Sequence, residues 1–373
     1  MPSSSLGHVI CPRSLFCGLL LAALTFSSES SARRSKAPPP PLPKAAPLTT
    51  LPLPPLSAAQ RARLASVEAD PKPEQIVRDS HYWVSNEHSH QLWYPHLKEL
   101  RGGYIGVGTD QNYLLAGWAR SELLVLMDFD QAIPELHRVY HCFFRFSESP
   151  EHFFSRWKRA RREESVALVR ECLSPLDAAQ GRSGARWLRY QLKIFKRIQN
   201  LIFRRLRKTK RQFQSLKIPT FLSDQGQYDW IRSLWQGGRV LAIRGDLTAS
   251  KTMRGLGTLF EELRLPLNVL YLSNAEQYFE YTPQFRRNII SQSWGPDSLV
   301  LRTLGWRVHG YVDDDEGYHY NIQSGENLSD WMRLSRVSKI GRLLRYKSPL
   351  ETAGFSRLSR PPVEGRRPPQ IAP

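Results

Sequence analysis

Tyr104-Ile105-Gly106-Val107-Gly108-Thr109-Asp110-Gln111-Asn112 is the stretch that decides the fold. It runs from an apolar segment into a Gly-x-Gly turn and then into a segment of helical character. A second apolar segment follows, Leu123-Leu124-Val125-Leu126-Met127-Asp128, and it ends in a carboxylate. Strand, glycine turn, helix and second strand form the opening βαβ unit of nucleotide-binding sheets. The pattern therefore predicts such a sheet and the position of its ligand crevice.

Short apolar segments alternate with helical patterns along the rest of the chain. This alternation predicts an α/β fold with a Rossmann-like, mostly parallel sheet and helices on both faces. Strands are expected at 103–107, 123–128, 239–244, 267–272 and 298–304, with a hairpin within 306–322. Helices are expected at 110–121, 131–146, 150–173, 185–215, 225–236 and 249–264.

The two ends of the chain differ in composition from its middle. Residues 1–32 contain an apolar run of signal-peptide length, so they are expected to be a secretory signal that directs the chain to the periplasm or envelope. If this leader is not a signal, the protein is cytoplasmic. Residues 33–75 are expected to be a Pro-rich linker and residues 346–373 a disordered tail. The folded domain is then 76–345.

Two cysteines, Cys142 and Cys172, lie within the expected domain. In an exported protein they could form a disulfide. They could equally be two buried free thiols, because Cys142 lies in an apolar run. The sequence leaves both alternatives open.

The sequence contains little evidence for a metal site or for the nucleophile of a serine hydrolase. His137 and His141 are four residues apart on an expected helix, but no third ligand and no Cys-x-x-Cys accompany them, so no metal site is expected. The Gly-x-Ser-x-Gly context of a serine nucleophile is absent from the sequence.

The formal net charge of +19 favours an anionic partner. A helical insertion is expected at about 150–217, and its part from 187 to 217 holds eleven Lys or Arg residues and no acid. This basic helix could bind an anionic membrane surface or a polyanion, or it could be an amphipathic helix whose charges simply face water. The residues expected to make the anionic contacts are Arg204, Arg205, Arg207, Lys208, Lys210 and Arg211.

The predicted ligand crevice lies at Gly106-Val107-Gly108-Thr109-Asp110-Gln111-Asn112. Glycine allows backbone to approach a ligand closely, and the following helix offers free N–H groups. Asp128 comes 22 residues after Gly106, near the spacing of a ribose-binding carboxylate. Gln111 stands where the third glycine of G-x-G-x-x-G would be. The expected binding residues are Gly106, Gly108, Gln111, Asn112 and Asp128.

Polar residues also follow the third and fourth expected strands. Asp246 follows the third, and Asn274 and Glu276 follow the fourth. Because the carboxyl ends of parallel strands meet at one edge of a sheet, these three are candidate catalytic residues. The alternative for Asp246 and Asn274 is helix capping.

Four motifs occur together in one known family. GVGTDQN, LLVLMDFD, RGDLTASKTMRGLG and LYLSNAEQYF, in this order, resemble those of an uncharacterised bacterial family with a class I S-adenosylmethionine-methyltransferase-like fold. The upstream Val84-Ser85-Asn86-Glu87 also fits, and the resemblance covers about 82–304. It implies S-adenosylmethionine as the cofactor, with Gly106, Gly108 and Asp128 at cofactor positions.

Two functions remain open on these grounds. One is a methyltransferase-like protein that binds S-adenosylmethionine or a related nucleotide. The other is a non-catalytic exported envelope protein that uses the scaffold and the basic helix to bind anionic surfaces or polymers. The cofactor is made in the cytoplasm, whereas the leader predicts export, so these two features favour different functions.

Overall fold

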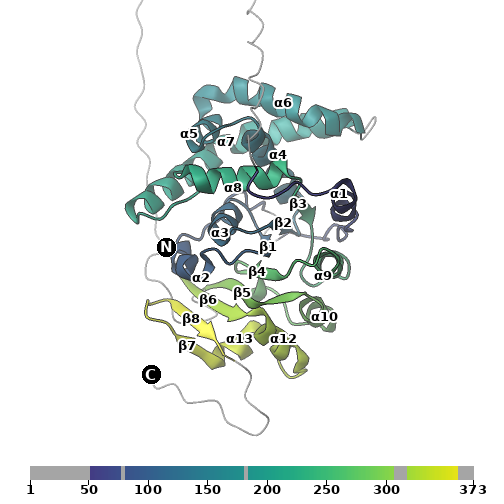
Figure 1. The fold of residues 1–373 in the computed structure, drawn as a ribbon, viewed down its shortest axis with the longest axis vertical. Coiled ribbons are helices and arrows are strands. Elements are labelled where there is room, and N and C mark those ends of the chain that lie inside the picture. Colours follow the sequence, from purple (N-terminus) through teal and green to yellow (C-terminus); the bar gives the residue numbers. More distant parts are fainter. Residues whose placement is uncertain (1–50, 77–79, 180–183, 306–316, 360–373) are drawn as a thin grey trace, which may run out of the picture. The chain divides into compact units, whose positions relative to one another are not determined.

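The centre of the fold is an eight-stranded, mostly parallel sheet with the order β3-β2-β1-β4-β5-β6-β8-β7 (Figure 1). A computed structural model of the chain describes residues 51–76, 80–179, 184–305 and 317–359. The Rossmann-like α/β class expected from the sequence is confirmed. The strands are β1 (Gly103–Val107), β2 (Leu123–Asp128), β3 (Val240–Arg244), β4 (Leu267–Tyr271), β5 (Trp294–Gly305), β6 (Tyr318–Ser324), β7 (Lys347–Pro349) and β8 (Phe355–Leu358).

The topology places a crevice between β1 and β4. Strands β3, β2, β1, β4 and β5 are parallel neighbours, and β6 returns antiparallel to β5. The chain passes from β1 to β2 on one side, while β4 pairs with the other side of β1. Such a switch point leaves a crevice at the carboxyl ends of the strands, where doubly wound sheets bind ligands.

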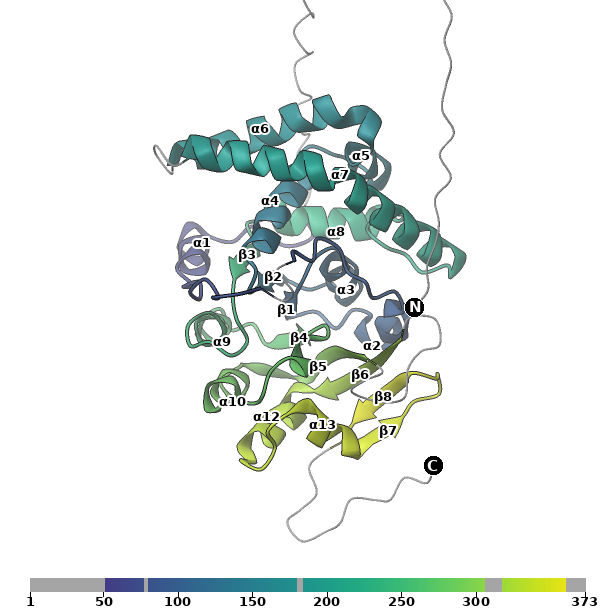
Figure 2. The ribbon, with the colours of Figure 1, turned by 180° about the vertical axis from the view of Figure 1, so that it is seen from behind.

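Helices cover both faces of the sheet (Figures 1 and 2). Leu124 and Leu126 of β2 belong to a core with α3, α4 and α8, while Leu123, Val125 and Met127 belong to a core with α9, α10 and α12. Successive strand side chains point to opposite faces, so a strand buried on both faces reads as one continuous apolar run. The helices are α1 (Ala58–Ala65), α2 (Tyr94–Leu97), α3 (Gln111–Ala119), α4 (Ala132–Arg145), α5 (Pro150–Arg156), α6 (Arg162–Ala179), α7 (Gly184–Ser215), α8 (Gln225–Gln236), α9 (Thr252–Glu262), α10 (Pro283–Ile290), α12 (Gly325–Arg333) and α13 (Ile340–Leu343).

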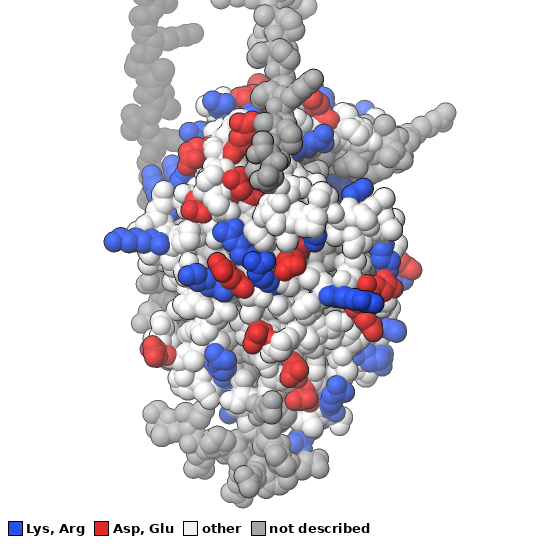
Figure 3. Space-filling model, viewed as in Figure 1, with Lys and Arg blue, Asp and Glu red and all other residues white. Residues whose placement is uncertain are grey.

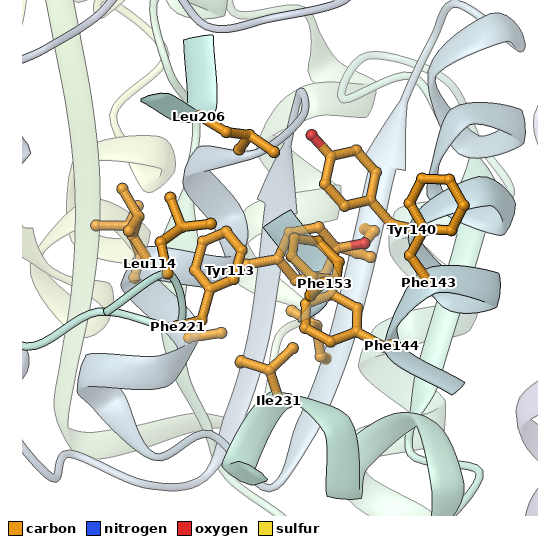
Figure 4. Packing of buried hydrophobic residues seen from close by; sticks show 14 of the residues in the cluster. Tyr113, Leu114, Tyr140, Phe143, Phe144, Phe153, Leu206, Phe221 and Ile231 are labelled. Atoms are coloured by element: carbon orange, nitrogen blue, oxygen red, sulfur yellow. The ribbon is translucent and has the colours of Figure 1, made fainter. Parts of the chain in front are cut away.

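An aromatic cluster joins the helical insertion to the sheet (Figure 4). Phe144 of α4 stacks on Phe153 of α5 with ring centroids 4.5 Å apart, and Tyr113 of α3 lies 5.2 Å from Phe144. Phe143 contacts Phe195 of α7 at 5.7 Å. Large buried aromatic side chains contribute most to such packing, so this cluster fixes α5 and α7 on the outside of α4.

The insertion differs from the expected single helix at 150–173. Two helices, α5 and α6, lie there with a turn between them. The fully buried Arg156 ends α5, and its carbonyl accepts a hydrogen bond from Ser165 Oγ at 2.7 Å. The helix expected at 185–215 is confirmed as α7. Cys142 of α4 and Cys172 of α6 form a disulfide with their Cα atoms 5.8 Å apart.

The domain extends beyond both expected boundaries. Leu56, Leu64 and Val67, in the segment expected to be linker, are buried in the core that contains α9. Phe355 and Leu358, in the segment expected to be a disordered tail, are buried in β8, which pairs with β6. The high proline content of both segments obscures the few apolar residues that anchor them.

Several expectations fall outside the described residues. These are the signal peptide, the first part of the linker, the tail beyond 359 and most of the expected hairpin, 306–316. The strand that returns after this gap is β6. No helix of the described segments is long and apolar enough to cross a membrane.

Candidate functional site

A cavity of about 460 Å³ opens at the carboxyl ends of β1, β2, β3 and β4. The loops that follow these four strands form most of its wall, and Ile76, residues from the segment 80–86 and Tyr318 at the start of β6 complete it. This is the switch-point crevice that the topology predicts, and its size suits a small-molecule ligand.

The five expected binding residues separate into two groups. Gly108, Gln111 and Asp128 line the cavity, whereas Gly106 and Asn112 do not. A Cβ atom on Gly106 would lie 2.0 Å from Asn112 Oδ1. The Asn112 amide donates to the carbonyls of residues 107 and 109 at 3.1 and 3.2 Å. Gly106 and Asn112 thus shape the turn from inside.

The turn after β1 is closed by the side chain of Gln111. Gly108 adopts a φ of +87°, which favours glycine, and its carbonyl accepts from the ring of His137. Gln111 Oε1 accepts a hydrogen bond from the Thr109 N–H at 3.2 Å. In phosphate-binding turns such N–H groups face the ligand. Here Gln111 accepts from the N–H of Thr109, so the turn has one fewer free donor for a phosphate.

Asp128 is a carboxylate that titrates near neutrality. It ends β2, is half-buried and lines the cavity. Burial raises the pKa of Asp128 to about 7, and the Asp130 charge adds to this shift, against hydrogen bonds from the N–H groups of Asp130 and Gly108. Small changes around this group therefore decide whether it is charged at physiological pH.

The cavity wall is acidic although the chain as a whole is strongly basic. Asp128, Asp130 and Asp246 line the cavity, and among the described residues no Lys, Arg or His lines it. Asp130 contacts the ring of His81, which lies outside the lining, at 2.7 Å. Within the described chain Asp128 and Asp246 form no ion pair. This arrangement disfavours an anionic ligand.

The wall that follows β3 depends on Asp70, a residue of the segment expected to be linker. Asp246 Oδ1 accepts from the Thr248 N–H at 2.7 Å, while α9 begins only at Thr252. The buried Asp70 accepts from the N–H groups of Asp246, Lys251 and Thr252 at 2.9, 3.0 and 3.3 Å. Asp70 thus caps α9 from a distant segment. Nothing local in the sequence marks it for this role.

Asp70→Ala is expected to lower the free energy of unfolding by about 2–3 kcal/mol, because three N–H groups lose a charged acceptor. Urea denaturation followed by circular dichroism measures the loss. The control is Glu74→Ala, which alters an exposed acid four residues away. Equal stability of the two variants would contradict the capping role.

The two candidate residues after β4 have different surroundings. Asn274 lines the cavity and its side chain makes no helix-capping hydrogen bond. Glu276 does not line the cavity: it is buried, pairs with Arg302 and accepts from Tyr281 Oη at 2.7 Å. The structure therefore gives Glu276 a structural ion pair in place of the expected cavity position.

Glu87 is a buried carboxylate beside the cavity that spacing alone did not single out. It accepts hydrogen bonds from the hydroxyls of Tyr271, Ser273 and Thr303, and His90 Nε2 lies 3.4 Å away. Burial opposes ionisation, but His90 and the hydroxyl donors outweigh it and lower the pKa of Glu87. Because Ser273 lines the cavity, Glu87 supports the wall from behind.

Arg205 is not on the surface, which corrects the expected set of anion-binding residues. Its Nε donates to Asp110 Oδ2 at 2.9 Å, and both side chains are buried. Nη2 donates to the Glu87 carbonyl at 3.0 Å, and Nη1 lies 2.6 Å from His88 Nδ1. Arg205 thus joins α7 to the turn after β1.

The two histidines considered as metal ligands have other partners. Tyr113 Oη donates to His137 Nδ1 at 2.9 Å, and burial lowers the pKa of His137 to about 4, so the ring is neutral. His141 stacks on Trp235 at 4.6 Å. The described part of the chain contains no group of three or more His, Cys, Asp or Glu that could hold a metal ion.

The family comparison covers the strands and strand-end loops that form most of the cavity wall. A family model described as "Domain of unknown function (DUF7790)" matches residues 82–359. The chain belongs to this family. The DUF7790 match includes every described strand from β1 to β8 and the four loops at their carboxyl ends. No curated protein matches the chain.

Proposed function

We propose that the cavity binds S-adenosylmethionine or a closely related cationic nucleoside. The acidic lining carries this proposal, because Asp128, Asp130 and Asp246 would repel a nucleotide phosphate and attract a sulfonium or ammonium group. The closed turn at Gln111 supports it, since a nucleoside without phosphates needs no phosphate cradle.

The lining residues suit separate parts of such a ligand. Asp128 would accept hydrogen bonds from the ribose hydroxyls, and Gly108 would let the backbone approach the sugar. Phe129, Ile133 and Phe279 give the cavity an apolar wall for the base. When bound, S-adenosylmethionine would supply an electrophilic methyl group. Asp246 and Asn274 line the cavity and remain the candidates for positioning an acceptor.

Calorimetric titration of the chain from residue 33 onward, which contains every described residue, tests the proposal. S-adenosylmethionine is expected to bind more tightly than S-adenosylhomocysteine, its demethylated product, which lacks the sulfonium charge. ATP is expected not to bind. Asp128→Ala should weaken binding by about 10- to 100-fold, the effect of losing hydrogen bonds to a charged group. Tight binding of ATP, or no binding of either adenosyl ligand, would refute the proposal.

The affinity for S-adenosylmethionine should rise with pH. The ligand's ribose hydroxyls donate to the ionised form of Asp128, whose pKa is raised to about 7, so affinity increases as pH passes through 7 and levels off above it. Between pH 6 and pH 8 the ionised fraction grows about tenfold, and the affinity should follow. Titrations across this range measure the change.

Two variants make the pH test specific. Asp128→Asn should bind more weakly and show a flat profile across the same range. Asp330→Asn, which changes an exposed acid outside the cavity lining, should keep the wild-type profile. A sloping profile in Asp128→Asn would assign the titration to another group.

A second candidate function is an exported, non-catalytic envelope protein. The Cys142–Cys172 disulfide favours it, because disulfides persist mainly in oxidising compartments. Cell fractionation combined with thiol labelling separates the two candidates. A mature, disulfide-bonded chain in the envelope that binds no adenosyl ligand would support the second; a cytoplasmic chain that binds S-adenosylmethionine would support the first.

A further inference from the structure

The exposed apolar side chains of the described chain gather at two places. Tyr82 and Tyr278, 49% and 56% exposed, lie at the cavity. Tyr190 and Leu201 lie on α7, and Leu216 directly follows it, with 48%, 37% and 45% of their surface exposed. The first pair can be explained by a cavity ligand, whereas the second group lies away from that cavity.

The exposed face of α7 combines these apolar side chains with cations. Residues 190, 193, 197, 201, 204, 208 and 211 follow one another at intervals of three or four, so they share one face of the helix. This stripe is about 32 Å long at the rise of an α-helix. All of its members are exposed, and they are Tyr190, Lys193, Arg197, Leu201, Arg204, Lys208 and Arg211.

The cations of the stripe are free to meet an external partner. None of them forms an ion pair with a described residue, whereas Arg205 and Lys210 of the same helix pair with Asp110 and Glu151. A shallow, open hollow of about 400 Å³ lies between Arg204, Arg207, Lys208 and Arg211, and none of the described residues that line it is acidic. A repeated positive field with no compensating acid attracts polyanions.

Charges of both signs lie elsewhere on the surface. Figure 3 shows a side on which Lys and Arg are interspersed with Asp and Glu. The long α7 helix lies in the foreground of Figure 2, the reverse view. The net positive charge of the chain is therefore not spread evenly, because α7 contributes cations and no acid.

We propose that the exposed face of α7 docks the protein on an anionic phospholipid surface. Cations in a straight row would contact lipid headgroups, and Tyr190, Leu201 and Leu216 would enter the interface. A nucleic acid would use the cations but would leave the two exposed leucines without a partner, because it is bound through phosphates and stacked bases. The docking is independent of the ligand cavity.

Co-sedimentation with vesicles tests this docking on the chain from residue 33 onward. The chain is expected to bind vesicles of phosphatidylcholine with about 30 mol % phosphatidylglycerol, and not vesicles of phosphatidylcholine alone. The triple variant Arg204→Glu, Arg207→Glu, Lys208→Glu should lose at least about 100-fold in partitioning, since each basic residue near the surface contributes to binding. The double variant Tyr190→Ser, Leu201→Ser should lose about tenfold.

A matched control separates this face from the net charge. Arg254→Glu, Arg287→Glu, Arg336→Glu reverses three exposed cations outside α7 and should reduce partitioning less than the α7 triple variant. Thermal melts should show all variants folded. Equal loss in the two triple variants would overturn the proposal. So would undiminished binding by the double variant, or tighter binding to a duplex oligonucleotide than to the anionic vesicles at the same salt concentration.

Discussion

Arg205→Met is expected to lower the free energy of unfolding by about 3–5 kcal/mol, because it leaves the buried Asp110 carboxylate without its cation. The same substitution at Arg204, one residue away and exposed, should cost less than about 0.5 kcal/mol. The two side chains have the same chemistry and neighbouring positions on α7, so the difference isolates burial and pairing. Urea denaturation of both variants measures it.

A second substitution identifies the cause of that loss. Asp110→Asn removes the charge that Arg205→Met leaves unpaired, so the double variant should recover part of the stability. The cycle of single and double variants gives the coupling between the two groups. Additive losses, with no recovery, would mean that Arg205 stabilises the fold through its contacts with the Glu87 carbonyl and His88 alone.

Loss of the disulfide should have a comparable effect. Cys142 and Cys172 are separated by 30 residues, and closing a loop of that size in the unfolded chain stabilises the native state by about 3–4 kcal/mol. Reductant should therefore lower the melting temperature of the wild-type chain markedly. The variant Cys142→Ser, Cys172→Ser should melt at the lower temperature with or without reductant.

Thiol counting provides the independent check on the disulfide. A chain from residue 33 onward contains two cysteines, since Cys11 and Cys17 precede it. When this chain is purified under oxidising conditions and then denatured without reductant, it should show no reactive thiol. Two free thiols in that assay would show that the pair is reduced, and the stability difference should then vanish.

Much of the fold could be predicted because the central strands are buried on both faces. Such strands read as continuous apolar runs, and glycine and polar residues mark their carboxyl ends. The same rule predicts that Gly108, Asp128, Asp246 and Asn274 lie close together, and all four line one cavity. It could not distinguish Asn274 from Glu276, because the partner that removes Glu276 from the cavity, Arg302, lies on another strand.

The periodicity of the basic helix distinguishes Arg205 from its exposed neighbours. Arg205 falls in register with Ile198, Ile202 and Thr209, and all four are buried on one face of α7. An arginine on the apolar face of a helix indicates a buried partner. The partner itself, Asp110, lies 95 residues earlier in the chain and could not be located from sequence spacing.

The contacts of Asp70 set an order of events during synthesis of the protein. Its carboxylate accepts from the N–H of Lys251, which lies 181 positions later in the chain. The loop beside β3 therefore cannot reach its native shape until that residue has been synthesised. A ribosome adds residues at about 5–20 per second, so the segment around Asp70 stays without its partner for roughly ten seconds or more. During that time the segment is accessible to chaperones.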